Sequence, residues 1–120
     1  MFKAVLKVGV CEIASKAASY VDALKEQRKL LNGVEFSENF KFSCVIDLKN
    51  EMTFSNITTE AQLLILQTEQ SPHAIAQNST LNKQALYRCL NGQTKLNPTG
   101  LELLRQYVKK QKSSHTIKKT

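Results

Sequence analysis

The chain has 120 residues, of which 42% are hydrophobic, and its formal net charge is +7. This length and composition can bury the core of one domain or of two very small ones. The longest apolar runs, such as residues 63–66, are far below the ~20 residues that span a bilayer. The first ten residues lack the full apolar segment of a signal peptide. Composition therefore predicts a cytoplasmic protein with no membrane segment.

The cysteines and histidines do not form a recognisable site. The cysteines are widely spaced and odd in number, which fits neither a zinc site nor a disulfide framework; they are Cys11, Cys44 and Cys89. Each is expected to be a small buried side chain in a reducing compartment. His73 and His115 have no ligand neighbours at metal-binding spacing, and no catalytic motif is present. The sequence predicts no enzyme activity, no metal and no cofactor.

Positive charge is concentrated in the second half of the chain. Residues 1–57 carry eight Lys and Arg against seven Asp and Glu, whereas residues 58–120 carry nine against three. Such a concentration is typical of proteins that bind polyanions. The alternative is a solvated basic tail that only aids solubility.

The first half is predicted to be mainly helical. Residues 2–8 fit either a strand or a first helical turn. Residues 11–31 carry apolar residues among charged ones, which favours two helices broken near Ala18-Ser19 and ended by Asn32-Gly33. Residues 1–38 are therefore expected to form a helical N-terminal half.

Residues 39–57 are predicted to form a central β-hairpin. Apolar and polar side chains alternate through residues 40–48, with Val45 as the exception, and strict alternation is typical of a half-buried strand. Lys49-Asn50 fits a turn, and residues 52–54 fit a returning strand. A lone hairpin is marginal in water. It therefore needs residues 2–8 as a third strand, or helices on its apolar face.

The second half, residues 58–110, is predicted to contain four helices, each preceded by residues typical of a helix start. These helices are 60–69 after Thr58 or Thr59, a short helix opened by Ser71-Pro72, 83–90 after Asn82, and 98–110 opened by Asn97-Pro98. The basic tail, residues 111–120, is expected to be disordered. The fold class expected for the chain is α+β and mostly helical.

The segment 83–90 has two contrasting faces. Leu86, Cys89 and Leu90 recur at helical spacing on one of them. Asn91-Gly92 then closes the helix with residues that tolerate a left-handed conformation. The opposite face carries long hydrogen-bonding side chains, namely Lys83, Gln84, Tyr87 and Arg88. Such a face suits the DNA major groove, where Arg or Lys reads guanine and Gln or Asn reads adenine.

Residues 75–98 resemble the helix-turn-helix of phage-repressor-type (Xre-like) regulators. Ile75-Ala76 matches the conserved pair of that family's second helix, Leu81-Asn82 its apolar-cap step, and Asn91-Gly92 its terminal Asn-Gly. Thr80 stands where the family has a turn glycine, so the turn is expected to differ or to be strained. The resemblance covers residues 58–108. It implies a helix-turn-helix that binds double-stranded DNA without a cofactor.

The resemblance also assigns roles to residues. Base contacts are expected from Lys83, Gln84 and Arg88, with Tyr87 and Asn82 as further candidates, although Tyr87 fits core packing equally well and Asn82 is first a helix cap. Phosphate contacts are expected from Ser71, Gln93, Thr94 and Lys95. A second candidate DNA-binding face in the N-terminal half is Lys16, Lys25, Arg28 and Lys29, for which the alternative is an ordinary solvated surface.

A weak internal repeat suggests a second helix-turn-helix. Ile13-Ala14 precedes Asn32-Gly33 much as Ile75-Ala76 precedes Asn91-Gly92. If the repeat is structural, the chain is an internal pseudo-dimer; the alternative is that Leu-Asn-Gly is simply a common helix ending. This organisation is similar to that of small TraN-type regulators of Gram-positive conjugative plasmids. That resemblance implies a helix-turn-helix at each end and repression of transfer genes.

The function expected from these patterns is sequence-specific binding of double-stranded DNA, as a transcriptional repressor of a mobile-element (conjugative transfer) operon. The protein would be a monomer with an internal pseudo-dimer, or a homodimer through the 39–55 hairpin. The alternative is a protein-interaction module, such as an antitoxin or a phage- or plasmid-encoded inhibitor, on the same scaffold. RNA binding is a third alternative, although no aromatic RNA-recognition strand motif is present.

Overall fold

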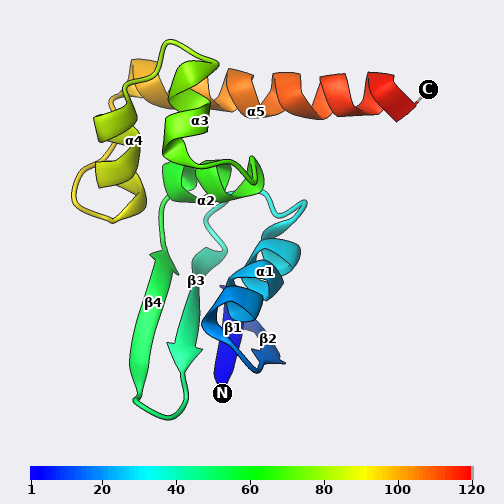
Figure 1. Ribbon diagram of the computed structural model, residues 1–120, viewed down its shortest axis with the longest axis vertical. Coiled ribbons are helices and arrows are strands. Elements are labelled where there is room, and N and C mark those ends of the chain that lie inside the picture. The colour runs from blue at the N-terminus through cyan, green and yellow to red at the C-terminus, as the bar shows by residue number, and fades with distance from the viewer. Residues whose placement is uncertain (120) are drawn as a thin grey trace.

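The computed structural model describes residues 1–119, with side chains described through Gln111. The elements are β1 (Phe2–Val8), β2 (Cys11–Ala17), α1 (Tyr20–Leu31), β3 (Phe40–Asp47), β4 (Met52–Ile57), α2 (Glu60–Gln67), α3 (Pro72–Gln77), α4 (Lys83–Leu90) and α5 (Pro98–Lys119). The strands form one antiparallel sheet in the order β2-β1-β3-β4. Helix α1 lies along this sheet, and α2 to α5 gather at one end of it (Figure 1).

The N-terminal half begins with a sheet, so the predicted helical N-terminal half is wrong. Residues 11–17, predicted to be helical, form β2, which pairs with β1 along its whole length. Gly9 has a φ of 60° in the two-residue turn between them, a position that glycine occupies in tight hairpins. With one strand and one helix in residues 11–31, there is no second helix-turn-helix among them. The predicted internal pseudo-dimer is therefore wrong as well.

Helix α1 covers one face of the sheet. Ser19 caps its start by accepting a hydrogen bond from the Asp22 N–H through its side chain, and the helix ends at Leu31, before Asn32-Gly33 as predicted. The buried Gln27 points to the sheet, where its Nε2 donates to Ser43 Oγ (3.1 Å) and to the Ser55 carbonyl (2.9 Å). Satisfying this buried amide avoids the cost of an unpaired polar group.

The central hairpin is confirmed as β3 and β4, and residues 2–8 supply its third strand. Its turn is held by Asp47. The Asp47 carboxylate accepts hydrogen bonds from the Asn50 side chain (2.8 Å) and from the backbone N–H groups of Lys49 (3.0 Å) and Asn50 (3.2 Å). These bonds, with the Asn50 side chain first, hold the pKa of Asp47 below its usual value.

A pH-dependent contribution to stability follows from Asp47. A carboxyl with a depressed folded-state pKa stabilises the fold fully above its unfolded pKa of ~3.9, and this contribution is lost as the pH falls through the folded pKa. We expect Asp47→Asn to lower the melting temperature at neutral pH, and this difference to shrink below about pH 4. Circular-dichroism melts of both proteins over a pH series measure the difference. A difference that does not change with pH would contradict this assignment.

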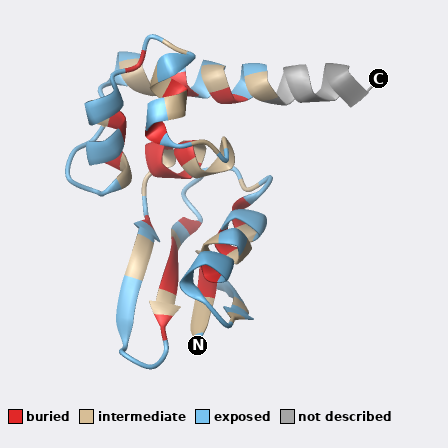
Figure 2. Ribbon diagram, viewed as in Figure 1, coloured by how far each residue is buried: buried red, intermediate tan, exposed pale blue. Residues whose placement is uncertain are grey.

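Two clusters of buried side chains fill the interior. The sheet core consists of Leu6, Leu31, Phe40, Ile57 and Leu63. The head core, between α2, α3, α4 and α5, consists of Ala61, Ile65, Ile75, Leu81, Leu86, Cys89 and Leu104. Helix α2 contributes to both cores, and its residues are buried or half-buried throughout (Figure 2). Leu90 of α4 also packs against both cores.

Two glutamines of α2 strengthen this junction. Gln62 Nε2 donates to the carbonyl of Asn56, at the end of β4, and to that of Leu90, at the end of α4, each at 3.1 Å. Gln67 Nε2 donates to the carbonyls of Leu31 (3.0 Å) and Val34 (2.8 Å). The sheet and the C-terminal helices are therefore joined by hydrogen bonds as well as by apolar contacts.

Candidate nucleic-acid interface

Helices α3 and α4 are joined by a short turn that packs into the head core. Ser71 caps α3 through its side chain, with Pro72 in the first turn, as predicted. In the turn, Ser79 Oγ donates to the Ile75 carbonyl (2.7 Å) and accepts from the Leu81 N–H (3.2 Å), which directs Leu81 into the core. Thr80 does not have a positive φ. The turn therefore needs no glycine, and the expected strain at Thr80 is absent.

Helix α4 has the two faces that its sequence predicts. Asn82 caps it by accepting a hydrogen bond from the Ala85 N–H (3.1 Å), and Leu86 and Cys89 are buried in the head core. The opposite face is exposed and consists of Lys83, Gln84, Tyr87 and Arg88. Within the described part of the chain, none of these four side chains is engaged in a hydrogen bond or an ion pair. The exposed face of α4 is therefore free to meet a ligand.

The end of α4 is fixed by a Schellman motif, in which two backbone N–H groups return to the last turn. The Gly92 N–H donates to the Cys89 carbonyl (3.0 Å), and the Gln93 N–H donates to the Arg88 carbonyl (2.9 Å). This ending places Gln93, Thr94 and Lys95 in an exposed loop directly after α4. The predicted phosphate-contacting loop therefore adjoins the exposed face of α4.

Gly92 is expected to be costly to replace. Its φ is +78°, and a Cβ there would find Gln62 Nε2 at 3.8 Å as its nearest neighbour, so the cost is conformational and not steric. We expect Gly92→Ala to lower the free energy of unfolding by about 1–2 kcal/mol, because the left-handed conformation is unfavourable for alanine. Gly92→Asn should cost less, because Asn tolerates this conformation. Urea titrations of the three proteins measure both differences, and equal costs for Ala and Asn would contradict this explanation.

The residues of the second candidate DNA-binding face do not form one continuous surface. Lys25, Arg28 and Lys29 are exposed on α1, and Lys29 lies 3.5 Å from Glu26. Ser15 Oγ donates to Glu26 of α1 (3.2 Å), so the next residue along β2, Lys16, lies on the sheet face away from α1. Both elements also lie far from α4 (Figure 1).

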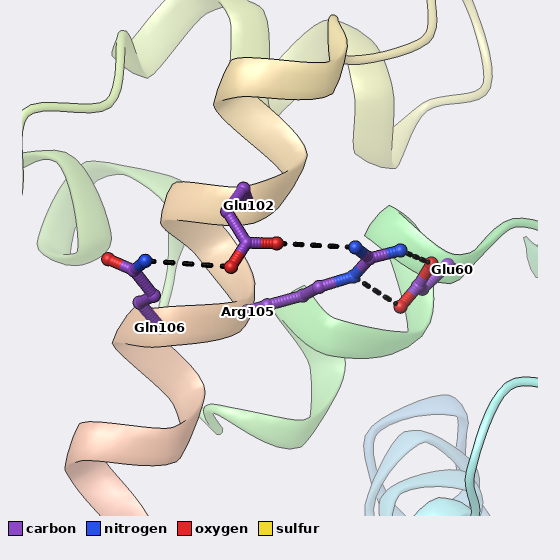
Figure 3. Close-up of polar contacts among 4 residues, drawn as sticks. All are labelled: Glu60, Glu102, Arg105 and Gln106. Atoms are coloured by element: carbon purple, nitrogen blue, oxygen red, sulfur yellow. Dashed lines mark hydrogen bonds and ion pairs between the residues drawn. The ribbon is translucent and has the colours of Figure 1, made fainter.

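An ion-pair cluster that sequence reasoning missed joins α5 to α2. Arg105 donates two hydrogen bonds to the Glu60 carboxylate (2.6 and 2.8 Å) and one to Glu102 (3.3 Å), while Gln106 contacts Glu102 on the outer side (Figure 3). The hydrogen bonds and charge of Glu60 raise the pKa of Arg105 above its usual value. Glu60 and Arg105 lie far apart in the sequence, and no local pattern indicates their pairing. The pair links α5 to the first turn of α2.

The cysteines differ from one another in exposure. Cys44 and Cys89 are buried as predicted, and burial raises the pKa of both thiols, which disfavours reactive thiolates. Cys11 is exposed on β2, so the prediction that all three are buried is wrong for it. Through the described residues, no group of three His, Cys, Asp or Glu side chains could hold a metal ion. Over the same residues, no helix is both long and apolar enough to cross a membrane.

No protein-family model, curated protein or solved structure matches the chain.

Proposed function

We propose that this protein binds double-stranded DNA sequence-specifically and reads the major groove with the exposed face of α4. One observation carries the proposal. Gln84 and Arg88 are exposed one helical turn apart, free of partners among the described residues, on a helix whose opposite side is anchored by Leu86 and Cys89. The major groove admits an α-helix, and a helix anchored on one side can present a fixed set of side chains to base edges.

The roles along α4 follow from position and chemistry. Lys83 and Gln84 lie in the first turn, the end that enters the groove in helix-turn-helix proteins. Arg88 suits bidentate contact with guanine, and Gln84 suits adenine. Asn82 is already engaged as the helix cap, so its contribution to base reading is secondary. Tyr87 is 41% exposed and is suited to a thymine methyl or a phosphate.

Phosphate contacts would position the protein without reading sequence. Gln93, Thr94 and Lys95 are exposed beside the end of α4, and the Ser71 hydroxyl is exposed at the start of α3. Each neutralised phosphate releases counterions, so affinity should fall steeply as salt rises.

The biological role that fits this mode of binding is repression in the cytoplasm, by occupying a promoter-proximal site and blocking polymerase. Support comes from the resemblance of residues 75–98 to phage-repressor-type regulators. The narrower expectation, a TraN-type regulator of a conjugative-transfer operon, relied on a helical N-terminal half with a second helix-turn-helix. The N-terminal sheet removes that support. The proposal is therefore limited to a DNA-reading repressor.

The test begins with enrichment of binding sites from random duplex DNA, followed by fluorescence-anisotropy titrations at several salt concentrations. We expect a shared sequence motif among the enriched duplexes and a preference for it over a scrambled duplex. If no duplex is enriched above non-specific binding at moderate salt, the proposal fails. Copurification of a stoichiometric protein partner would then favour the protein-interaction alternative.

A further inference from the structure

The two edges of the sheet differ in regularity. At β4 the register with β3 shifts between Ser43 and Val45, and Ser55 adopts a φ of 51°, which interrupts the strand. At the other edge, β2 pairs with β1 without interruption from Cys11 to Ala17 and contains no proline. Natural proteins usually protect free edges with irregularities such as those of β4, because a regular exposed edge can pair with another strand. Edge β2 lacks such an irregularity. Charged side chains can also protect an edge, but the two on β2, Glu12 and Lys16, are opposite in sign and can pair with those of a second β2 strand.

The register of β2 with β1 determines which backbone N–H and C=O groups of β2 remain available to another strand. Val8 and Cys11 are register partners on either side of the two-residue Gly9-Val10 turn. In an antiparallel ladder, alternate residues bond to the neighbouring strand and the others direct their backbone groups to the opposite side. Counting from the turn, the outward-directed residues of β2 are Glu12, Ala14 and Lys16.

We propose that β2 pairs antiparallel with β2 of a second copy of this chain, about a two-fold axis at Ala14, so that the two sheets become one. In this register Ala14 faces its own counterpart. Glu12 faces Lys16 of the second copy, and the symmetry repeats this pair. All three outward-directed residues then form hydrogen bonds with the second copy, and each Cys11–Ala17 strand pairs with the other along its whole length. A second copy is favoured as the occupant because the strand is complementary to itself in charge.

Charges already present in the sheet favour this register. Within one copy, Lys16 lies opposite Lys3 on β1, and like charges directly opposite each other are unfavourable. In the proposed pair, Glu12 of the second copy would lie on the other side of Lys16 and compensate this repulsion. With the axis at Ile13, Glu12 would face Ala14 of the second copy and not Lys16. With the axis at Ser15, Lys16 would face Ala14 and not Glu12. Only the axis at Ala14 matches both charges.

The surroundings of β2 leave room for the second copy. Ile13 is 52% exposed and lies on the same sheet face as Ser15, which contacts α1. Pairing would cover part of this exposed apolar side chain. Edge β2 and helix α4 lie at opposite sides of the molecule (Figure 1), so the pairing leaves the exposed face of α4 open.

The first test is disulfide trapping of the full chain without DNA, in a Cys11→Ser background. Across the axis, Ala14→Cys would place two thiols on residues whose Cα atoms are ~5.5 Å apart, within the range of disulfides. Thr53→Cys is the control, because Thr53 is exposed on β4, at the opposite edge of the sheet, and takes no part in the proposed pairing. We expect mild oxidation to link the Ala14→Cys chains efficiently and the Thr53→Cys chains little. Equal linking of the two variants would overturn the proposal.

The second test is a charge-reversal cycle measured by sedimentation equilibrium, again without DNA. Wild type should approach twice the 13.5 kDa chain mass as its concentration rises. Glu12→Lys and Lys16→Glu should each weaken the dimer about tenfold or more, because two like-charge pairs form per dimer, and the double reversal should recover most of the loss. Circular-dichroism melts confirm that each variant is folded. A wild type that stays monomeric, or a double reversal no better than the single ones, would overturn the proposal. Since DNA is absent, either result is independent of the proposed DNA reading.

Discussion

The double variant Gln84→Ala plus Arg88→Ala is expected to lose most of its preference for the enriched duplex while it keeps its fold. A good bidentate base contact contributes ~1–3 kcal/mol of discrimination, so the two together account for roughly 2–6 kcal/mol, or about 30-fold to 10⁴-fold in affinity. The loop after α4, which is proposed to contact phosphates, is unchanged. Binding to a scrambled duplex should therefore fall much less than binding to the enriched one.

A matched control removes the same two side-chain types elsewhere. Gln106 on α5 and Arg28 on α1 are both exposed. Among the side chains that the structure describes, their only hydrogen bond is a 3.5 Å contact from Gln106 to Glu102. Gln106→Ala plus Arg28→Ala should leave the preference nearly intact. Anisotropy titrations of both double variants against enriched and scrambled duplexes at one salt concentration make the comparison. A comparable loss in the control would indicate that diffuse positive charge supplies the affinity, which would contradict reading by α4.

Ile65→Ala is expected to destabilise the whole molecule and not only the head core. Ile65 is fully buried on α2, and truncation of such a residue costs ~2–5 kcal/mol. At roughly 4 °C per kcal/mol for a chain of this size, the melting temperature should fall by about 8–20 °C. Leu103→Ala on α5 is the control, because Leu103 is 37% exposed and should change the free energy of unfolding by no more than about 0.5 kcal/mol.

Because α2 contributes to both cores, the loss of stability caused by Ile65→Ala is expected to affect the sheet core as well as the head core. We consider the amides of β1 and β3 that exchange with solvent only through global unfolding. If the sheet and the helices unfold together, these amides should exchange faster in Ile65→Ala by the same factor as the amides of α2. That factor is roughly 30-fold to several-thousand-fold. Hydrogen exchange followed by NMR measures both sets. Unchanged protection in β1 and β3 would show that the sheet core is stable without the head core.

The C-terminal helices were predictable because each begins or ends at a residue whose effect is local. The end of α5 is the exception: it was predicted at residue 110, with a disordered tail after it, whereas the helix continues to Lys119. Thr59, Ser71 and Asn82 cap their helices through their own side chains, and Gly92 ends α4 through its own backbone conformation. Residues 11–17 were mispredicted because an exposed edge strand has little alternation of apolar and polar side chains. Ile13 and Ala17 are spaced as on a helix, and only pairing with β1 decides their structure.

The contacts that unite the molecule were not predictable. Gln27, Gln62 and Gln67 resemble ordinary surface residues in the sequence, yet each bonds to groups far along the chain. The same holds for Arg105 and Glu60. Such pairs arise only when the fold brings distant backbone carbonyls and carboxylates together. The exposed face of α4, in contrast, was predictable because its residues are close neighbours on one helix.

The uneven distribution of charge also affects how the molecule would approach a polyanion. The sheet half, residues 1–57, is nearly neutral, whereas residues 58–120 carry a large excess of Lys and Arg. Such an asymmetry gives the molecule an electric dipole, and the field of a polyanion would turn its helical end forward before contact. Long-range orientation of this kind raises the association rate constant and is screened by salt, whereas dissociation depends on the short-range contacts that hold the complex together. Added salt should therefore slow the encounter much more than it hastens release.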